Sequence, residues 1–248
     1  MTSIYREALG DDFRRLHPRL QWRFGFSSTD GVCQIGTGVM DEIWRGRAFT
    51  LPFLLLGSTR RVLFPSRGRG VPFNISNYAY MDSFGRETVT WARRFRMRRR
   101  LRAFDATMVY SKERGSVVDY LGTHQHLAVD IRCSVDDDGA MCFRSGGQRF
   151  YEGPVAFRFP LFLSGVANVR EWWDEESTVS HRRERIEPHL WAALRVSRHF
   201  QGRRTRVPSG RRSPRRAPRS GGVPALNPTI TVSPALRQLC MGITGSSR

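Results

Sequence analysis

Apolar residues at the start of this 248-residue chain recur at helix-like intervals. Ile4, Leu9 and Phe13 follow the spacing of one helix face. The spacing predicts a helix over about residues 4–16, which Pro18 helps to end because proline disrupts a helix from within.

From about residue 31 onward, apolar and polar residues alternate with the period of β-strands. In residues 88–97, for example, Trp91, Phe95 and Met97 share one face, and in residues 127–133 the apolar face carries Ile131. Strands are predicted over residues 73–81, 88–97, 104–110, 116–121, 127–133, 141–144, 155–159 and 169–173.

Glycine, acidic and small polar residues form turn signals between these runs, at residues 82–85, 112–115, 136–139 and 145–147. Many short strands joined by hairpin turns predict a mainly β (α+β) fold, an antiparallel meander or partly closed barrel with an N-terminal helix. That helix and residues 51–63 would pack against the sheet or plug one end.

The strand pattern stops after about Glu176. Residues 202–224 consist mainly of Arg, Pro, Gly and Ser, which cannot bury enough apolar surface to offset the loss of chain entropy. The sequence therefore predicts a β-rich domain over residues 1–176 and a basic, disordered tail over residues 177–248.

Positive charge is concentrated in that tail. The chain has 41 Lys plus Arg against 22 Asp plus Glu, a formal net charge of +19, and Lys112 is its only lysine. Such a preference for arginine indicates GC-rich codon usage more than phosphate binding, which lysine also serves well. Residues 1–180 hold 26 basic and 20 acidic groups, an ordinary balance. We therefore do not expect nucleic-acid binding from residues 1–176.

The sequence shows no sign of a transmembrane or secreted protein. No apolar run reaches the roughly 18 residues needed to span a bilayer, and the first residues lack the pattern of a signal peptide. Cys33, Cys133, Cys142 and Cys240 have no Cys-x-x-Cys spacing. They are typical of reduced thiols, so we expect a cytoplasmic location.

Several runs in order resemble one bacterial family. They are Tyr5-Arg6-Glu7-Ala8-Leu9-Gly10, Leu16-His17-Pro18, Gly36-Thr37-Gly38-Val39-Met40, Phe84-Gly85-Arg86-Glu87-Thr88-Val89-Thr90-Trp91, Asp119-Tyr120-Leu121-Gly122-Thr123-His124-Gln125-His126-Leu127 and Gln148-Arg149-Phe150-Tyr151-Glu152-Gly153-Pro154. Over about residues 3–176 the chain resembles the uncharacterised family of the domain of unknown function 4166. The resemblance implies a domain without an established activity. It also implies an oxidoreductase partner, since some members are joined to a nucleotide-binding oxidoreductase domain, although no Gly-rich dinucleotide fingerprint is present here.

The resemblance ends where the predicted tail begins. Family members continue with another strand, whereas residues 187–196 here read Glu-Pro-His-Leu-Trp-Ala-Ala-Leu-Arg-Val. Back-translated with GC-rich codons and read one base later, this stretch recovers the family's segment. We hypothesise a reading-frame shift near Ser177. The alternative is a genuine basic tail, and the nucleotide sequence after codon 176 decides between them.

His124 and His126 are the sharpest candidates for chemistry. Residues i and i+2 of a strand point the same way, so the two imidazoles could share a metal, with Glu152 or Asp119 as a third ligand. Glu152 could also be a general acid or base if it lies in an apolar cavity, and Asp119 has the same ambiguity. The alternative is that the histidines lie on a polar face and the carboxylates pair with arginine.

Two further groups have an open interpretation. Seven arginines in residues 93–102 could contact phosphate or anionic lipid headgroups, or form a solvated strand face. A set of aromatic residues could line a ligand cavity or simply form the core: Tyr78, Tyr80, Trp91, Phe104, Tyr110, Phe150 and Tyr151.

The leading hypothesis is a domain that binds an apolar or amphipathic small molecule in a barrel-like interior. One alternative is an enzyme or metal-binding module that uses His124 and His126 with Glu152. Another is an accessory domain to a nucleotide-binding oxidoreductase. The sequence identifies no cofactor.

Overall fold

The fold is built around one antiparallel sheet. The computed structural model describes residues 1–43, 51–62, 64–152, 155–159, 166–174, 179–187 and 198–206, and its sheet contains eleven strands within them. The strands are β1 (Val32–Ile43), β2 (Gly68–Met81), β3 (Glu87–Arg96), β4 (Leu101–Ser111), β5 (Ser116–Leu121), β6 (Leu127–Val135), β7 (Met141–Glu152), β8 (Val155–Phe159), β9 (Val166–Asp174), β10 (Val179–Glu187) and β11 (Arg198–Arg206). The helices are α1 (Ile4–Leu9), α2 (Pro18–Phe24) and α3 (Leu51–Thr59).

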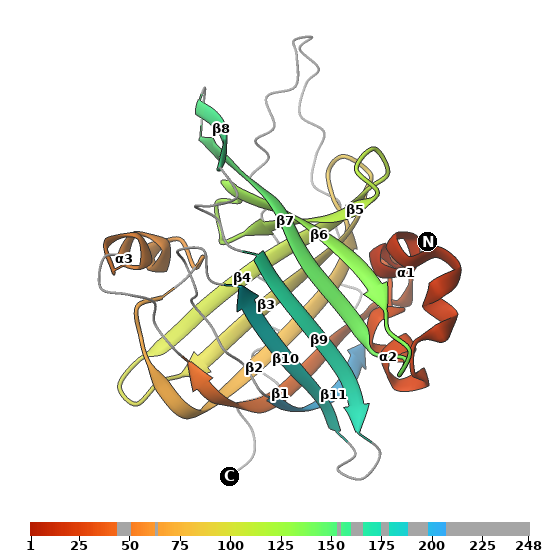
Figure 1. Cartoon of the computed structure of the whole chain (residues 1–248), viewed down its shortest axis with the longest axis horizontal. Coiled ribbons are helices and arrows are strands. Elements are labelled where there is room, and N and C mark those ends of the chain that lie inside the picture. Colours follow the sequence, from red (N-terminus) through yellow and green to blue (C-terminus); the bar gives the residue numbers. More distant parts are fainter. Residues whose placement is uncertain are drawn as a thin grey trace.

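Strands β1 to β7 form a meander in which each strand pairs with the next. Strand β7 then pairs with both β8 and β9, and β10 and β11 continue the sheet to the free edge of β1. Figure 1 shows the resulting curvature. A single residue pair, Ser180 opposite Phe200, joins β10 to β11, so the curled sheet is not a closed barrel. The predicted mainly β meander with an N-terminal helix is confirmed.

Two strands come from beyond Glu176, where the alternating pattern ends. Strand β10 pairs along β9, and β11 pairs with β1 from Val32 opposite Arg206 to Met40 opposite Arg198. Residues 202–206 therefore lie in a strand, not in a disordered segment as predicted. The reason is that pairing at a sheet edge uses main-chain groups, which every residue except proline supplies. The rest of the predicted disordered tail, residues 207–248, lies outside the described residues.

The N-terminal helix is shorter than predicted. Helix α1 begins after Ser3, whose Oγ accepts from the Arg6 N–H at 3.1 Å, and ends at Gly10, which has a φ of 55°. A 3₁₀ segment follows, and Pro18 then begins α2 instead of ending α1. Proline suits the first position of a helix because its missing N–H would have no partner there. The side chain of His17 caps α2, because its Nδ1 atom accepts from the Arg19 N–H at 3.2 Å.

The main core lies on the sheet face that α1 covers. The Tyr5 ring lies 5.1 Å from the Phe24 ring, 6.5 Å from Trp91 and 6.2 Å from Phe143, between ring centroids. Its hydroxyl donates to the sulfur of Met108 at 3.3 Å. The contacts with Phe24 and Phe143 are edge-to-face, a geometry that stabilises a ring pair beyond the burial of its surface. We call the sheet face that α1 covers the inner face. Met108 lies on it, and the residues directly before and after Met108 in β4 lie on the opposite, outer face.

A buried ion pair joins α2 to β9. The Arg23 guanidinium binds the Glu171 carboxylate, and the two side chains are only 6% and 2% exposed. The guanidinium also lies 5.7 Å from the Trp91 ring centroid. Because an uncompensated buried charge is costly, this pair holds the helical segment and the sheet in one arrangement.

One predicted turn is a distortion within a strand. Residues 145–147 lie inside β7, where Ser145 pairs with Ile131 and Gln148 with Val129. Two residues, Gly146 and Gly147, thus face the single residue Asp130, which is the count of a β-bulge. Glycine in a strand often marks such a bulge, so the signal was real but its interpretation as a turn was wrong.

The cysteines differ in state. Cys133 and Cys142 are free thiols, and burial raises the pKa of Cys133 to about 12. Cys33 is disulfide-bonded, so the expectation of reduced thiols is wrong at this position. Sequence spacing does not report which cysteines the fold brings together. A cytoplasmic location, inferred from the thiols, stays a prediction. Within the described residues, no helix has the length and apolar content to cross a bilayer.

Candidate functional site

A cavity of about 390 Å³ lies on the outer face of the sheet, which we call the outer pocket. Val109 of β4 and Val118 of β5 form its floor; they pair directly across the two strands. The inner face, where we predicted a ligand, instead holds the large cluster of packed side chains around Tyr5 and Trp91. The full lining of the outer pocket is Phe84, Arg86, Val109, Tyr110, Ser111, Lys112, Glu113, Arg114, Val118, Tyr120, Gln125, Arg149 and Tyr151.

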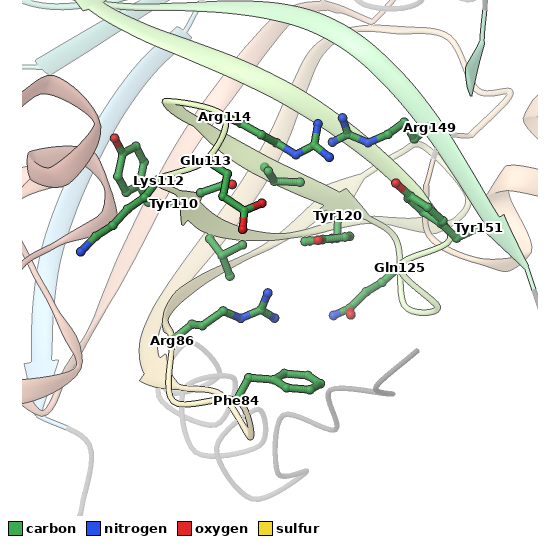
Figure 2. A pocket seen from close by; sticks show the side chains of 13 residues that line it. Phe84, Arg86, Tyr110, Lys112, Glu113, Arg114, Tyr120, Gln125, Arg149 and Tyr151 are labelled. Carbon is green, nitrogen blue, oxygen red and sulfur yellow. The ribbon is translucent and has the colours of Figure 1, made fainter. Parts of the chain in front are cut away.

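Three arginines lie around the outer pocket on two sides. Figure 2 shows the guanidinium groups of Arg114 and Arg149 close together on one side and Arg86 beside Phe84 on the other. The ring of Tyr120 lies between these two sides, and the ring of Tyr151 lies near Arg149. The pocket therefore combines cations with aromatic surface.

The bulge in β7 places a carboxylate beside this cluster. Asp130, opposite the bulge, accepts two hydrogen bonds from Arg149, at 2.7 Å and 2.5 Å. The bonded carboxylate raises the pKa of Arg149. Arg114 lies 3.7 Å from the same carboxylate. A single negative charge therefore lies next to two positive charges. The Nε atom of Arg149 is buried and has no hydrogen-bond partner among the described residues.

The opposite side of the outer pocket is a tight turn between β2 and β3. Asp82 binds the Arg86 guanidinium at 2.8 Å and 2.7 Å and accepts from the Phe84 and Arg86 N–H groups, each at 2.9 Å. Gly85 has a φ of 72°, a conformation that glycine adopts without strain. The turn thereby places the Phe84 ring at the outer pocket, where the Arg86 guanidinium lies 5.0 Å from the centroid of the ring.

The charges around the outer pocket leave a small positive excess. Four cationic side chains line it, and the carboxylates of Glu113, Asp82 and Asp130 offset three of them. Tyrosine hydroxyls can donate or accept hydrogen bonds, and the valine floor is apolar. Such a surface suits a molecule with an aromatic or aliphatic body and one anionic group.

The structure brings His124 and His126 together in the loop between β5 and β6, not on a strand as the i and i+2 spacing assumed. Their ring centroids lie 5.5 Å apart. The Nδ1 atom of His126 lies 2.8 Å from Nη1 of Arg60, and since a guanidinium can only donate, Nδ1 accepts and the neutral ring carries its proton on Nε2. Neither nitrogen then offers a lone pair to a metal in this arrangement. Within the described residues, no group of three or more metal-ligating side chains is present.

Gly122 allows the backbone at Arg60 to lie close to the loop that carries His126. Gly122 has a φ of 77°, and a Cβ atom there would lie 2.4 Å from the Arg60 carbonyl oxygen. The same carbonyl accepts from the Thr123 N–H at 2.9 Å. Only glycine permits this approach, which sets Arg60 beside the loop of His126.

The two carboxylate candidates, Asp119 and Glu152, lie on β5 and β7, the strands on either side of β6, and the structure describes the side chain of Asp119 alone of the two. Asp119 is buried in β5 opposite Met108 and Val129, so it lies on the inner face. Glu152 is the last residue of β7, where it pairs with Val155, and its side chain lies outside the described part of the structure. The prediction of a shared site with the histidines is thus not tested for Glu152.

Most of the outer pocket was not predicted from the sequence. The aromatic residues considered for a ligand cavity include Tyr110 and Tyr151 but not Tyr120, and neither Arg114 nor Arg149 was a candidate. Two signals were present in the sequence. Val118 and Tyr120, two residues apart, share one face of β5, and the glycine pair at residues 146–147 marks the bulge. Their convergence depends on strand register, which the sequence pattern leaves open.

Comparison with known proteins supports the resemblance noted in the sequence. The uncharacterized protein YndH of Bacillus subtilis (strain 168) is 30% identical to this chain over 176 residues, which cover 71% of this chain and 84% of YndH. No solved structure matches. The sequence model of the domain of unknown function DUF4166 matches residues 16–183. This chain therefore belongs to the DUF4166 family.

Proposed function

We propose that this domain binds a small amphipathic molecule with one anionic group, and that the site is the outer pocket. The observation that carries the proposal is the shared carboxylate: Asp130 lies within reach of both Arg149 and Arg114. An anionic group beside Arg114 would restore local charge balance. The valine floor and tyrosine rings would bury the rest of the ligand.

The volume and position of the pocket support the same proposal. At about 390 Å³ it falls within the common range of small-molecule sites, roughly 300–1,000 Å³. It is also framed by turns held by hydrogen bonds, as at Asp82. A site that is formed before binding loses less entropy when a ligand enters.

Two fluorescent probes test this function. 8-Anilinonaphthalene-1-sulfonate has an aromatic body with one sulfonate, and N-phenyl-1-naphthylamine has a similar body without the charge. We expect saturable binding of the sulfonate by the full chain and at least about tenfold weaker binding of the neutral probe, because a charge-assisted hydrogen bond contributes about 1.5–3 kcal/mol.

Variants then locate the binding site. Arg114→Gln and Tyr120→Ala should each weaken sulfonate binding, whereas Arg144→Gln, an exposed arginine outside the pocket lining, should leave it unchanged. Equal affinity of the two probes, or equal binding by Arg114→Gln and Arg144→Gln, would contradict the proposal.

A metal site at His124 and His126 is the second candidate, supported by the 5.5 Å between their rings. It requires the contact between Arg60 and His126 to open. Zn²⁺ titration of the full chain, followed by calorimetry, tests it. The expected result is binding that His124→Ala abolishes, and an unchanged titration in that variant would eliminate the site.

A further inference from the structure

Arginines without carboxylate partners gather at the turn between β3 and β4. Arg96, Arg98, Arg99 and Arg100 are exposed there, and within the described residues none of them forms an ion pair. This differs from Arg94 in the preceding strand, which binds the buried carboxylate of Asp105. The four turn arginines therefore remain available to a partner outside the chain.

The beginning of β2 adds to the same charged surface. A Cβ atom at Gly68 would lie 3.1 Å from the Met97 methyl group, so this segment lies against the turn. Its neighbours Arg67 and Arg69 are exposed. We call Arg67, Arg69, Arg96, Arg98, Arg99 and Arg100 together the basic end.

The basic end holds most of the positive excess of the β-rich domain. Residues 1–180 contain six more basic than acidic groups. The acidic residues at the adjoining end of β1 are Asp41 and Glu42, and Glu42 lies 3.5 Å from Arg69. The charge of the domain is thus polarised toward this end of the sheet.

Exposed leucines accompany these arginines. Leu101, directly after the turn, is 67% exposed, and Leu55 of α3 is 52% exposed. Leu101 lines a cavity of about 280 Å³ together with Thr59 at the end of α3. Leu55 lies four residues before Thr59 and so on the same side of the helix. Figure 1 shows α3 on the side of the molecule away from α1 and α2.

We propose that the basic end docks this protein onto a bilayer surface rich in anionic lipids. Arginines near such a surface are attracted to lipid phosphates, and exposed leucines gain by entering the boundary between headgroups and acyl chains. Nucleic acid also attracts arginine, but it offers no apolar layer to Leu55 and Leu101. The combination of unpaired cations with exposed aliphatic side chains therefore favours lipid.

Vesicle co-sedimentation of the full chain tests the docking. The wild-type chain should bind vesicles of phosphatidylglycerol and phosphatidylcholine in equal parts, bind phosphatidylcholine vesicles far more weakly, and lose affinity as salt is raised. Residues 181–248 contain 15 arginines of their own, so the informative quantity is the difference between matched variants.

The matched variants remove the same charge at two places. Arg98→Gln/Arg99→Gln/Arg100→Gln acts at the basic end, and Arg14→Gln/Arg132→Gln/Arg144→Gln removes three exposed arginines elsewhere. A surface arginine near an anionic bilayer contributes about fivefold, so the first variant should lose on the order of a hundredfold in affinity. The control should bind within a few-fold of the wild-type chain.

A second variant separates lipid from nucleic acid. Leu101→Gln should weaken vesicle binding several-fold without changing the binding of a short DNA duplex. Equal vesicle binding by the two triple variants would overturn the proposal. So would an unchanged affinity of Leu101→Gln for vesicles together with tight, salt-sensitive duplex binding, which would assign the basic end to nucleic acid.

Discussion

Arginine has two different roles at the two ends of strand β3. At the end that adjoins the outer pocket, Arg86 is bound by Asp82, and across the pocket Arg149 is bound by Asp130. At the other end, about 30 Å away along a ten-residue strand, Arg98 and Arg99 are exposed and have no ion pair within the described residues. The number of arginines therefore predicts little about their roles, because the nearest carboxylate and the access of water decide what each one does.

The largest expected effect concerns the most deeply buried arginine pair. Glu171→Ala leaves the Arg23 guanidinium uncompensated inside the protein, so the free energy of unfolding should fall by about 3–5 kcal/mol. Urea unfolding measures this loss of free energy. The matched control is Asp12→Ala, which breaks the exposed pair with Arg15 and should cost under about 1 kcal/mol. Similar losses in both variants would refute the ranking by burial.

The arginine pair at the outer pocket should show an intermediate effect. Arg149 is 7% exposed and Asp130 is 22% exposed, so Asp130→Ala should cost about 1.5–3 kcal/mol, the range for hydrogen bonds to charged groups. A double-mutant cycle with Arg149→Met, read by urea unfolding, isolates the coupling between the two side chains. A coupling free energy near zero would mean that the interaction between Asp130 and Arg149 does not stabilise the fold.

A smaller effect should appear as acid sensitivity at the turn between β6 and β7. Desolvation alone would raise the pKa of Asp136, but hydrogen bonds from Arg170 and from the backbone lower it below its usual 3.8. A lowered pKa means that the carboxylate adds stability above its unfolded value and that this contribution is lost as pH falls through the folded value.

The stability advantage of the wild-type chain over Asp136→Asn should therefore be full near neutral pH and vanish in strong acid. Thermal unfolding measured across the acid range gives the two curves. A difference that does not change with pH would contradict the role of the Arg170 pair.

The smallest expected effect on stability lies at the basic end. The variant Arg98→Gln/Arg99→Gln/Arg100→Gln removes no ion pair within the described residues, so its free energy of unfolding should stay within about 0.5 kcal/mol of the wild-type value. Urea unfolding checks this. A loss of several kcal/mol would show that these arginines hold the fold, and the contrast between the two ends of β3 would fail.

Much of the β-rich fold was readable from the residues. Alternation predicted the strands at residues 116–121 and 155–159 with the bounds observed in β5 and β8. It also predicted the buried face of β3 through Trp91 and Phe95. Strand alternation is reliable where one face is buried, because a slip of one residue would move every apolar side chain to the other face.

The misses have a common cause in pairing between distant segments. Strand β11 has no alternating apolar pattern, yet it pairs with β1 through the backbone. The 3₁₀ segment breaks the helix that periodicity alone predicted over residues 4–16, and Pro18 begins a second helix instead of ending the first. Periodicity reports which side chains need burial, and it is silent about main-chain hydrogen bonds at an edge or a cap.

The candidate sites divide in the same way. The sequence placed His124 and His126 close together, since two residues of spacing set their distance locally. It did not place Arg149, Arg114 and Tyr120 around one cavity, because these residues come from different strands and turns. The tertiary structure also distinguished the arginine bound to Asp130 from those exposed at the basic end.

By itself, the sequence determined the family, the mainly β class, most strand positions and the excess of arginine, because each depends on residue identity or short-range period. The tertiary structure decided which sheet edge receives β11, which face is filled, where the outer pocket lies and which arginines lack a carboxylate. These features follow from strand register and from contacts between residues far apart in the chain, which local patterns do not encode.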